Sequence, residues 1–283
     1  HLWETAQTEC CMLKFRNILA AVVSTCCLSA NAGYFGAGTN RNATAITYGT
    51  NAVTAVYCGS NMVWGGTEAW TPASLPNCTL WLDASDSATI TLSNDYVVAW
   101  SDKSGKGNNT AQAAPAYRRL YKAADAVAGG LPSVSSDDRV TRHVLTPALS
   151  AAQMFFVTAY KDGNDATFDE YATIAVVDGS TSQRVGMGDI FKDSWYGTGV
   201  LANGAAKNGE SVASTVALPM PLCLLRFDFA GTVSNVWWIG SQATPGRGWQ
   251  GPICEVVFVS SALSSGDRAL LEAYLMAKWG ITP

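Results

Sequence analysis

Charged side chains are scarce in this 283-residue chain, since Asp, Glu, Lys and Arg make up only 14% of it and the net charge is −4. Ordinary soluble domains carry about 25% charged residues. Nucleic-acid binding needs an excess of Lys and Arg or a basic patch, so the composition argues against it. Disorder needs low hydrophobicity, whereas 48% of this chain is hydrophobic. A chain with so little charge is expected to be either secreted or assembled into something larger.

Histidine is nearly absent as well, because His1 and His143 are the only two in the chain. No C-x-x-C pair and no Cys/His pair occurs, so zinc binding is not expected. A Ser/His/Asp triad would have only His143 available, and the chain contains no G-x-S-x-G motif. His143 lies in an expected strand, where a structural role is favoured.

Glutamate is also rare, which bears on glycoside hydrolysis. Retaining glycosidases place two carboxyl groups about 5–5.5 Å apart, which on one strand face requires acidic residues at i and i+2 or i+4. The nearest grouping is Asp165 with Asp169 and Glu170, in a turn-rich stretch that we interpret as a solvated loop. We therefore expect no catalytic residues, and a glycan hydrolase is kept as an alternative.

Cysteine, in contrast, is well represented. The eight residues are Cys10, Cys11, Cys26, Cys27, Cys58, Cys78, Cys223 and Cys254. An even number in a weakly charged chain fits disulfides in an oxidising compartment. The two adjacent pairs do not bridge internally without strain. They cross-pair, bridge neighbouring subunits, or act as small buried hydrophobes, and the sequence leaves these alternatives open.

The first 33 residues contain the pattern of a secretory signal: a basic stretch, an apolar run at 18–28 and an A-x-A triplet at 30–32. The run is shorter than the roughly 20 residues of a membrane span. We favour a retained apolar anchor over residues 1–33, buried against other chains. A secreted protein whose first 32 residues are removed is the alternative. The anchor residues expected in this segment are Ile18, Val22 and Leu28.

Residues 34–75 are rich in Gly, Asn and Thr and contain a short repeat at 48–53 and 58–64. Each unit joins a Gly-Thr-Asn or Gly-Ser-Asn turn signal to alternating apolar residues, which predicts β-hairpins. Two units are too few to bury a core, so they must dock onto another surface. That surface is either a partner protein, with Tyr57 and Trp64 as contacts, or the domain that follows.

A linker at 71–76, with two prolines, precedes a run of short apolar segments separated by turn signals. The expected strands are 80–82, 96–100, 153–160, 172–177, 185–188, 222–229, 233–239 and 254–260. Many short strands with regular turns predict an all-β sandwich over residues 76–283. The tryptophans expected in its core are Trp81, Trp100, Trp279 and at least one of Trp237 and Trp238.

One helix is expected near the C-terminus. Ser264, followed three residues later by Asp267, predicts its N-cap, and Gly280 predicts its end. Its apolar face would consist of Leu270, Leu271, Tyr274, Leu275 and Trp279. We therefore expect a two-sheet sandwich closed by one C-terminal helix.

The two ends of this region carry recognisable motifs. LWLDASD at 80–86, WSDKSGKGN at 100–108, GPICEVVF at 251–258 and the stretch 262–281 resemble the first and last core elements of LamG-like, concanavalin A-like domains of bacterial and phage proteins. Such domains commonly continue with an aromatic residue and Asp-Gly where this chain has 135–138, Ser-Ser-Asp-Asp. The edge that follows is therefore expected to differ. The Glu-x-Asp-x-x-Glu strand of the family's hydrolases has no counterpart here.

The resemblance implies a concanavalin-like jelly roll and a lectin-like role. The phrase at 56–64 looks like the short N-terminal modules of phage virion and tail proteins. The implied function is a non-enzymatic fibre, spike or decoration protein of the virion, held to other virion proteins by its N-terminal arm. Such proteins form symmetric homo-oligomers, commonly trimers. A secreted or surface-anchored bacterial lectin-like protein is the alternative.

Two candidate sites follow. Sugars stack on aromatic rings while polar side chains orient their hydroxyls, and the loop residues that suit this role are Trp195, Tyr196, Arg247 and Trp249. Calcium prefers oxygen ligands, and the candidates for it are Asp83, Asp86, Asp102 and Asn108. In the structural alternative the tryptophans pack over the rim of the sandwich and the aspartates form Asx turns and caps.

Overall fold

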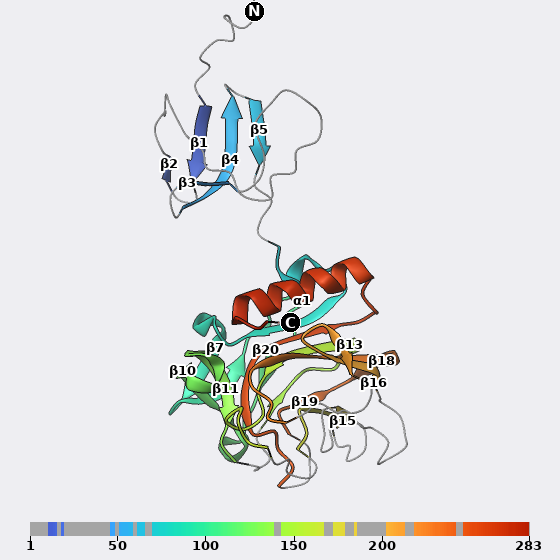
Figure 1. Cartoon of the computed structure of the whole chain (residues 1–283). Coiled ribbons are helices and arrows are strands. Elements are labelled where there is room, and N and C mark those ends of the chain that lie inside the picture. Colours follow the sequence, from blue (N-terminus) through green and yellow to red (C-terminus); the bar gives the residue numbers. More distant parts are fainter. Residues whose placement is uncertain are drawn as a thin grey trace, which may run out of the picture. The chain divides into compact units, whose positions relative to one another are not determined.

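The computed structural model divides the chain into two compact units, His1–Trp70 and Thr71–Pro283 (Figure 1). The second unit begins close to the boundary expected at residue 76. The main chain of five N-terminal strands is described, and beyond them the structure describes residues 70–138, 143–166, 172–178, 184–185, 202–212, 218–241 and 246–282.

The described strands of the first unit form one antiparallel sheet. They are β1 (Cys11–Phe15), β2 (Ile18–Leu19), β3 (Ile46–Tyr48), β4 (Asn51–Cys58) and β5 (Asn61–Gly65). The register pairs Tyr48 with Asn51 and Cys58 with Asn61, so both hairpins turn where the repeat predicts. β1 pairs with β4, which places residues 11–15 in the same sheet as the repeat rather than in a separate segment.

The expected anchor residues fall partly on this sheet. Ile18 lies on β2, Tyr57 on β4 and Trp64 on β5. Val22 and Leu28 lie outside the described residues.

The second unit is a continuous antiparallel ladder in the order β15-β14-β19-β12-β9-β8-β10-β11-β20-β13-β18-β16-β17, with β6 paired to β20 and β7 to β8. The strands are β6 (Cys78–Asp83), β7 (Ile90–Ser93), β8 (Tyr96–Trp100), β9 (Thr110–Ala111), β10 (Leu120–Asp125), β11 (Leu131–Ser136), β12 (Val144–Leu145), β13 (Leu149–Thr158), β14 (Ala175–Val177), β15 (Arg184–Val185), β16 (Ala202–Lys207), β17 (Glu210–Val212), β18 (Cys223–Asn235), β19 (Trp237–Ile239) and β20 (Gly251–Val259). Each expected strand overlaps one of these.

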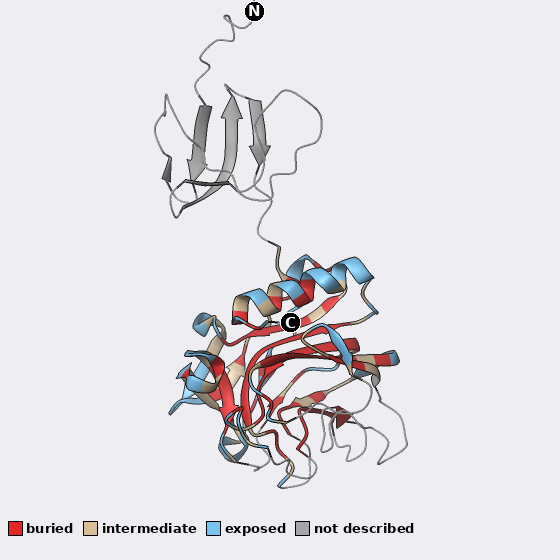
Figure 2. Cartoon of the chain, viewed as in Figure 1, coloured by how far each residue is buried: buried red, intermediate tan, exposed pale blue. Residues whose placement is uncertain are grey.

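Strands from the two halves of this ladder face each other across a core. The ring of Trp237 on β19 lies 6.1 Å from that of Phe258 on β20 and stacks 6.0 Å from that of Phe229 on β18. Figure 2 shows buried residues concentrated between these strands. The prediction of an all-β fold with a C-terminal helix is confirmed, and the strands pair antiparallel. The tryptophans expected in the core, Trp81, Trp100, Trp237 and Trp279, are each at most 5% exposed.

The C-terminal helix α1 (Ser265–Trp279) begins and ends as predicted. The Ser264 hydroxyl accepts the Asp267 N–H, and Gly280 closes the helix at φ 64°, a left-handed conformation that suits glycine. Leu271, Leu275 and Trp279 are buried. The expectation that Leu270 faces the core is wrong, because it is 52% exposed. The described part of the chain contains no helix that is long and apolar enough to cross a membrane.

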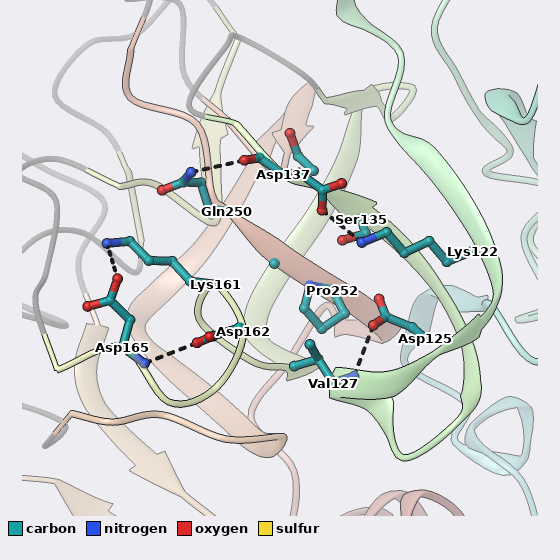
Figure 3. Close-up of a pocket in the computed structure, with 12 residues that line it drawn as sticks. Lys122, Asp125, Val127, Ser135, Asp137, Lys161, Asp162, Asp165, Gln250 and Pro252 are labelled. Atoms are coloured by element: carbon teal, nitrogen blue, oxygen red, sulfur yellow. Dashed lines mark hydrogen bonds and ion pairs between the residues drawn. The ribbon is translucent and has the colours of Figure 1, made fainter.

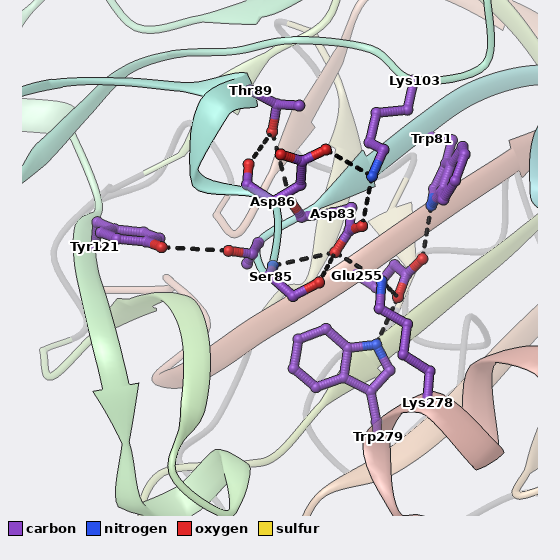
Figure 4. A network of polar contacts seen from close by, with 11 residues as sticks. Trp81, Asp83, Ser85, Asp86, Thr89, Lys103, Tyr121, Glu255, Lys278 and Trp279 are labelled. Atoms are coloured by element: carbon purple, nitrogen blue, oxygen red, sulfur yellow. Dashed lines mark hydrogen bonds and ion pairs between the residues drawn. The ribbon is translucent and has the colours of Figure 1, made fainter. Parts of the chain in front are cut away.

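A buried polar network fastens α1 to the sheet (Figure 4). The Lys278 ammonium lies 2.7 Å from Asp83 Oδ1 and 2.8 Å from Glu255 Oε2. Asp83 and Glu255 sit opposite each other on β6 and β20. The indole N–H groups of Trp81 and Trp279 donate to the two oxygens of Glu255, at 2.6 and 2.5 Å. Lys103 also binds Asp83, at 2.8 Å, so the two buried carboxylates are compensated by two lysines and two indoles.

This network predicts a pH dependence of folding. Burial raises the pKa of Glu255, Asp83 adds to that rise, and Lys278 opposes it. The stability that Glu255 contributes is therefore fully present below its unfolded pKa of about 4.3 and is lost as the pH rises through the folded value. Burial alone would also raise the pKa of Asp83, but Lys278 and Lys103 hold it below its ordinary value. Its contribution is present above about pH 3.9 and is lost on acidification.

We expect the unfolding free energy to reach its maximum in mildly acidic solution and to fall toward neutral pH. Glu255→Gln should flatten the fall above about pH 4.5, because glutamine has no proton to release. Urea denaturation at a series of pH values would measure both profiles. Profiles of identical shape for the two proteins would contradict this assignment.

Candidate functional site

A polar pocket of about 360 Å³ opens where β10, the end of β11 and the start of β20 meet the loop that follows β13 (Figure 3). The segments that form it are far apart in the sequence. β11 pairs with β10 on one side and with β20 on the other, and β20 pairs with β13. The antiparallel register therefore brings the ends of these strands to one edge of the sandwich.

Two ion pairs line the sides of the pocket. The Lys122 ammonium lies 2.7 Å from Asp137 Oδ1, and the Lys161 ammonium lies 2.7 Å from Asp165 Oδ2. All four side chains are partly or well exposed, so each pair adds little to folding stability. Asp162 Oδ1 accepts the N–H groups of Asn164 and Asp165 in an Asx turn that shapes the loop.

The floor of the pocket is more deeply buried. Asp125, 3% exposed, accepts the Val127 N–H through Oδ1 and the Ser133 hydroxyl through Oδ2. Ser133 and Ser135 point to the same side of β11 because strand residues alternate, while Val134 between them belongs to the core cluster. Ser135 thus lines the pocket next to a residue, Val134, that packs in the core.

Two polar atoms at this site are buried without a hydrogen-bond partner in the described part of the chain. They are the Ser135 hydroxyl oxygen and Gln250 Oε1. Gln250 already donates its amide N–H to the Asp137 carbonyl at 3.2 Å. A buried polar group left unpaired costs about 1–3 kcal/mol, so such groups are rare in folded proteins and call for an explanation. Both residues line the pocket, where a bound ligand would pair them.

A buried arginine holds the main chain around the pocket floor in place. Arg119, 1% exposed, donates to the carbonyls of Gly240, Trp249 and Gly251 and, more weakly, to that of Val134. Of these acceptors, Trp249 and Gly251 flank Gln250 in the chain, and Val134 precedes Ser135. The pocket is therefore held in shape before any ligand binds.

Gly251 has a steric role at the same place. Its φ of +103° is in the region that favours glycine, and a Cβ there would lie 2.6 Å from the Ala159 carbonyl oxygen. Only glycine lets β20 begin this close to the chain that leaves β13.

The residues that the sequence suggested for sugar binding have different outcomes in the structure. Trp195 and Tyr196 lie outside the described residues. Trp249 is only 2% exposed, and its indole N–H donates to the Thr158 hydroxyl and to the Ala159 carbonyl. It is a core residue behind the pocket, so the expectation that it presents a ring to a sugar is wrong. Arg247 is partly exposed and lies two residues before it.

The calcium candidates form ion pairs and turns instead of a cation site. Asp83 and Asp86 both bind the Lys103 ammonium at 2.8 Å. Asp102 accepts the main-chain N–H groups of Trp81, Ser104 and Asn108. Within the described ranges, no three His, Cys, Asp or Glu residues are grouped to hold a metal. The Asx-turn interpretation accounts for these contacts.

The cysteines of the described second unit and His143 are buried. Cys78, Cys223 and Cys254 are buried free thiols, and burial raises the pKa of Cys78 and Cys223 to about 12, which makes them poor nucleophiles. His143, 2% exposed, stacks 4.2 Å from the ring of Trp238. Its predicted structural role agrees with this burial.

Comparison with known proteins gives no match: no family model, no curated protein and no solved structure is significantly similar to this chain. The resemblance to LamG-like domains therefore stays a prediction from the sequence motifs. The sequence did mark one pocket segment, because 135–138 is where the chain departs from the pattern of that family. It gave no signal for Asp125, Lys161 or Gln250, whose proximity depends on strand pairing.

Proposed function

We propose that this chain is a non-enzymatic virion surface protein, a fibre, spike or decoration module, whose second unit is a concanavalin-like jelly roll that binds host glycans. The observation that carries the proposal is the preformed polar pocket with its unpaired Ser135 and Gln250 atoms. Its volume lies within the range of about 300–1,000 Å³ that is typical of small-molecule sites.

The chemistry of the lining supports a hydroxyl-rich ligand. A sugar hydroxyl donates one hydrogen bond and accepts two, so it can pair with ammonium groups, carboxylates, an amide oxygen and a serine hydroxyl. All of these project from the walls and floor of this pocket (Figure 3). Ordinary apolar ligands would leave the same groups unpaired.

A binding role is favoured over hydrolysis because every lining carboxylate is already engaged. Asp137 and Asp165 pair with lysines, Asp125 is fixed by a serine and a main-chain N–H, and Asp162 shapes a turn. A general acid or nucleophile must instead be directed at the substrate.

The first unit supports a role in assembly. Residues 1–80 contain only three basic residues, Lys14, Arg16 and Arg41, against three glutamates. Permanent interfaces are more hydrophobic than transient ones, so a segment this poor in charge suits an anchor to other virion proteins. The symmetric oligomer proposed with it, a trimer, is tested by light scattering of the purified full chain.

Glycan binding is tested on an array with the full chain. We expect retention by a subset of host glycans and at least about tenfold weaker binding by Gln250→Ala, which loses one ligand contact and the bond that orients the side chain. Asn109→Ala, an exposed amide outside the pocket, is the control and should bind normally. Equal binding by Gln250→Ala and the native protein would place the site elsewhere.

Two measurements separate the alternatives. New reducing ends after incubation with a bound polysaccharide would show a hydrolase and overturn the non-enzymatic role. Intact mass of the protein isolated from its source separates the other two: loss of residues through Ala32 would support a secreted lectin-like protein, and retention within purified particles would support the virion role.

A further inference from the structure

The charge of the pocket is one-sided. Among the described residues, its ionisable lining consists of four carboxylates and two ammonium groups, a net charge of −2: Asp125, Asp137, Asp162 and Asp165 with Lys122 and Lys161. Both lysines are already paired, with Asp137 and Asp165. Asp125 and Asp162 are bonded to neutral donors and pair with neither lysine, so the described lining keeps a net negative charge.

The two unpaired atoms give an independent indication of the ligand. Gln250 Oε1 can only accept, so it requires a donor from the ligand. The Ser135 hydroxyl, in a side chain 1% exposed, can both donate and accept. A neutral hydroxyl satisfies both atoms, whereas an ionised carboxylate has no proton to donate to Gln250.

We propose that this pocket selects an uncharged sugar residue, read through hydroxyl groups at Gln250 and Ser135, and that it rejects sugars bearing a carboxylate. The inference rests on the proposed glycan binding and adds its chemical class. Selectivity here arises from repulsion as well as attraction, because a carboxylate would enter a site of net negative charge and leave Gln250 unpaired.

The first experiment is titration calorimetry of the full chain with neutral oligosaccharides and with matched oligosaccharides that carry a uronic or sialic acid. We expect the acidic series to bind at least about tenfold more weakly at low salt, with a smaller difference at high salt because charge repulsion is screened. A preference for acidic sugars would overturn this inference alone. Failure of every sugar to bind would overturn the glycan function and this inference with it.

Ser135→Ala isolates the hydroxyl contact. Affinity for the neutral sugar should fall about 2- to 10-fold, the value of one hydrogen bond. Folding stability should not fall, since the hydroxyl has no internal partner to lose. Ser150→Ala, where the hydroxyl bonds Ser234 away from the pocket, is the matched control and should leave affinity unchanged. Unchanged affinity in Ser135→Ala would remove this residue from the site.

Asp162→Asn isolates the charge. Asparagine keeps the oxygen that accepts the turn N–H groups, so the loop is preserved while one negative charge is removed. Affinity for acidic sugars should rise several-fold and that for neutral sugars should stay within twofold. Asp95→Asn, in the exposed turn between β7 and β8, removes the same charge outside the pocket and should change neither. If Asp95→Asn raised the affinity for acidic sugars as much as Asp162→Asn, selection by the charge of the pocket would be contradicted.

Discussion

Lys278→Met is expected to lower the unfolding free energy of the second unit by about 3 kcal/mol. The lysine bridges Asp83 and Glu255, two carboxylates that sit opposite each other and are at most 4% exposed as side chains. Removing one member of a buried charge network costs about 3–5 kcal/mol, because the charges left behind have no compensation. The lower figure applies here since Lys278 is 22% exposed and Lys103 still binds Asp83.

Urea denaturation followed by tryptophan fluorescence measures this loss. Lys106→Met, at an exposed position, is the matched control and should cost less than about 0.5 kcal/mol. Adding Glu255→Gln to Lys278→Met should restore part of the loss, because one of the two uncompensated charges is then removed. If the double variant were less stable than the sum of the single changes, the network would not be electrostatic in origin.

Arg119→Met is the second large effect, with an expected cost of about 3–5 kcal/mol. Arg119 is 1% exposed, and its guanidinium donates hydrogen bonds to the main-chain carbonyls of Gly240, Trp249 and Gly251. These carbonyls lie at the two ends of the connection between β19 and β20. Methionine fills much of the volume but leaves several buried acceptors unpaired, at about 1–3 kcal/mol each before relaxation. Arg119→Lys should recover only part of the stability that Arg119→Met loses, because a single ammonium cannot reproduce the several N–H donors that the planar guanidinium directs at these carbonyls.

The adjacent Arg118 provides the control. It donates to the carbonyls of Gln112 and Ala113 at a more exposed position, so Arg118→Met should cost about 1 kcal/mol or less. Arg119→Met should also weaken glycan binding, since the chain around Gln250 and Ser135 would lose its support. A stable Arg119→Met protein with native affinity would show that the pocket does not depend on this residue.

The elements that were predictable are those set by local pattern. The run at 96–100 matches β8 residue for residue, and Ser264 and Gly280 bound α1 as capping preferences require. Strands with weak local signals were missed. β10 and β11 carry polar and exposed residues because they form the pocket wall, so they lack the continuous apolar run that marks β20.

The candidate site likewise has residues that local sequence predicts and residues that it does not. Trp249 was chosen because its flanking glycines suggest an exposed loop, yet its indole finds partners at Thr158 and Ala159, which lie about 90 positions away. For Glu255, in contrast, the sequence pattern indicates burial correctly. A lone glutamate in the apolar run 253–259 indicates a buried partner, but only the packing of α1 supplies Lys278 and Trp279.

By itself the amino-acid sequence determined the all-β fold class, the tryptophan core, the C-terminal helix and the low overall charge. These properties follow from composition and from side-chain periods of two and 3.6, which act over a few residues. The pocket, the Lys278 network and the carbonyl cluster around Arg119 were decided only by the tertiary structure. They join residues far apart in the chain, such as Asp83 and Lys278, and strand register, which local sequence does not encode, sets which residues meet.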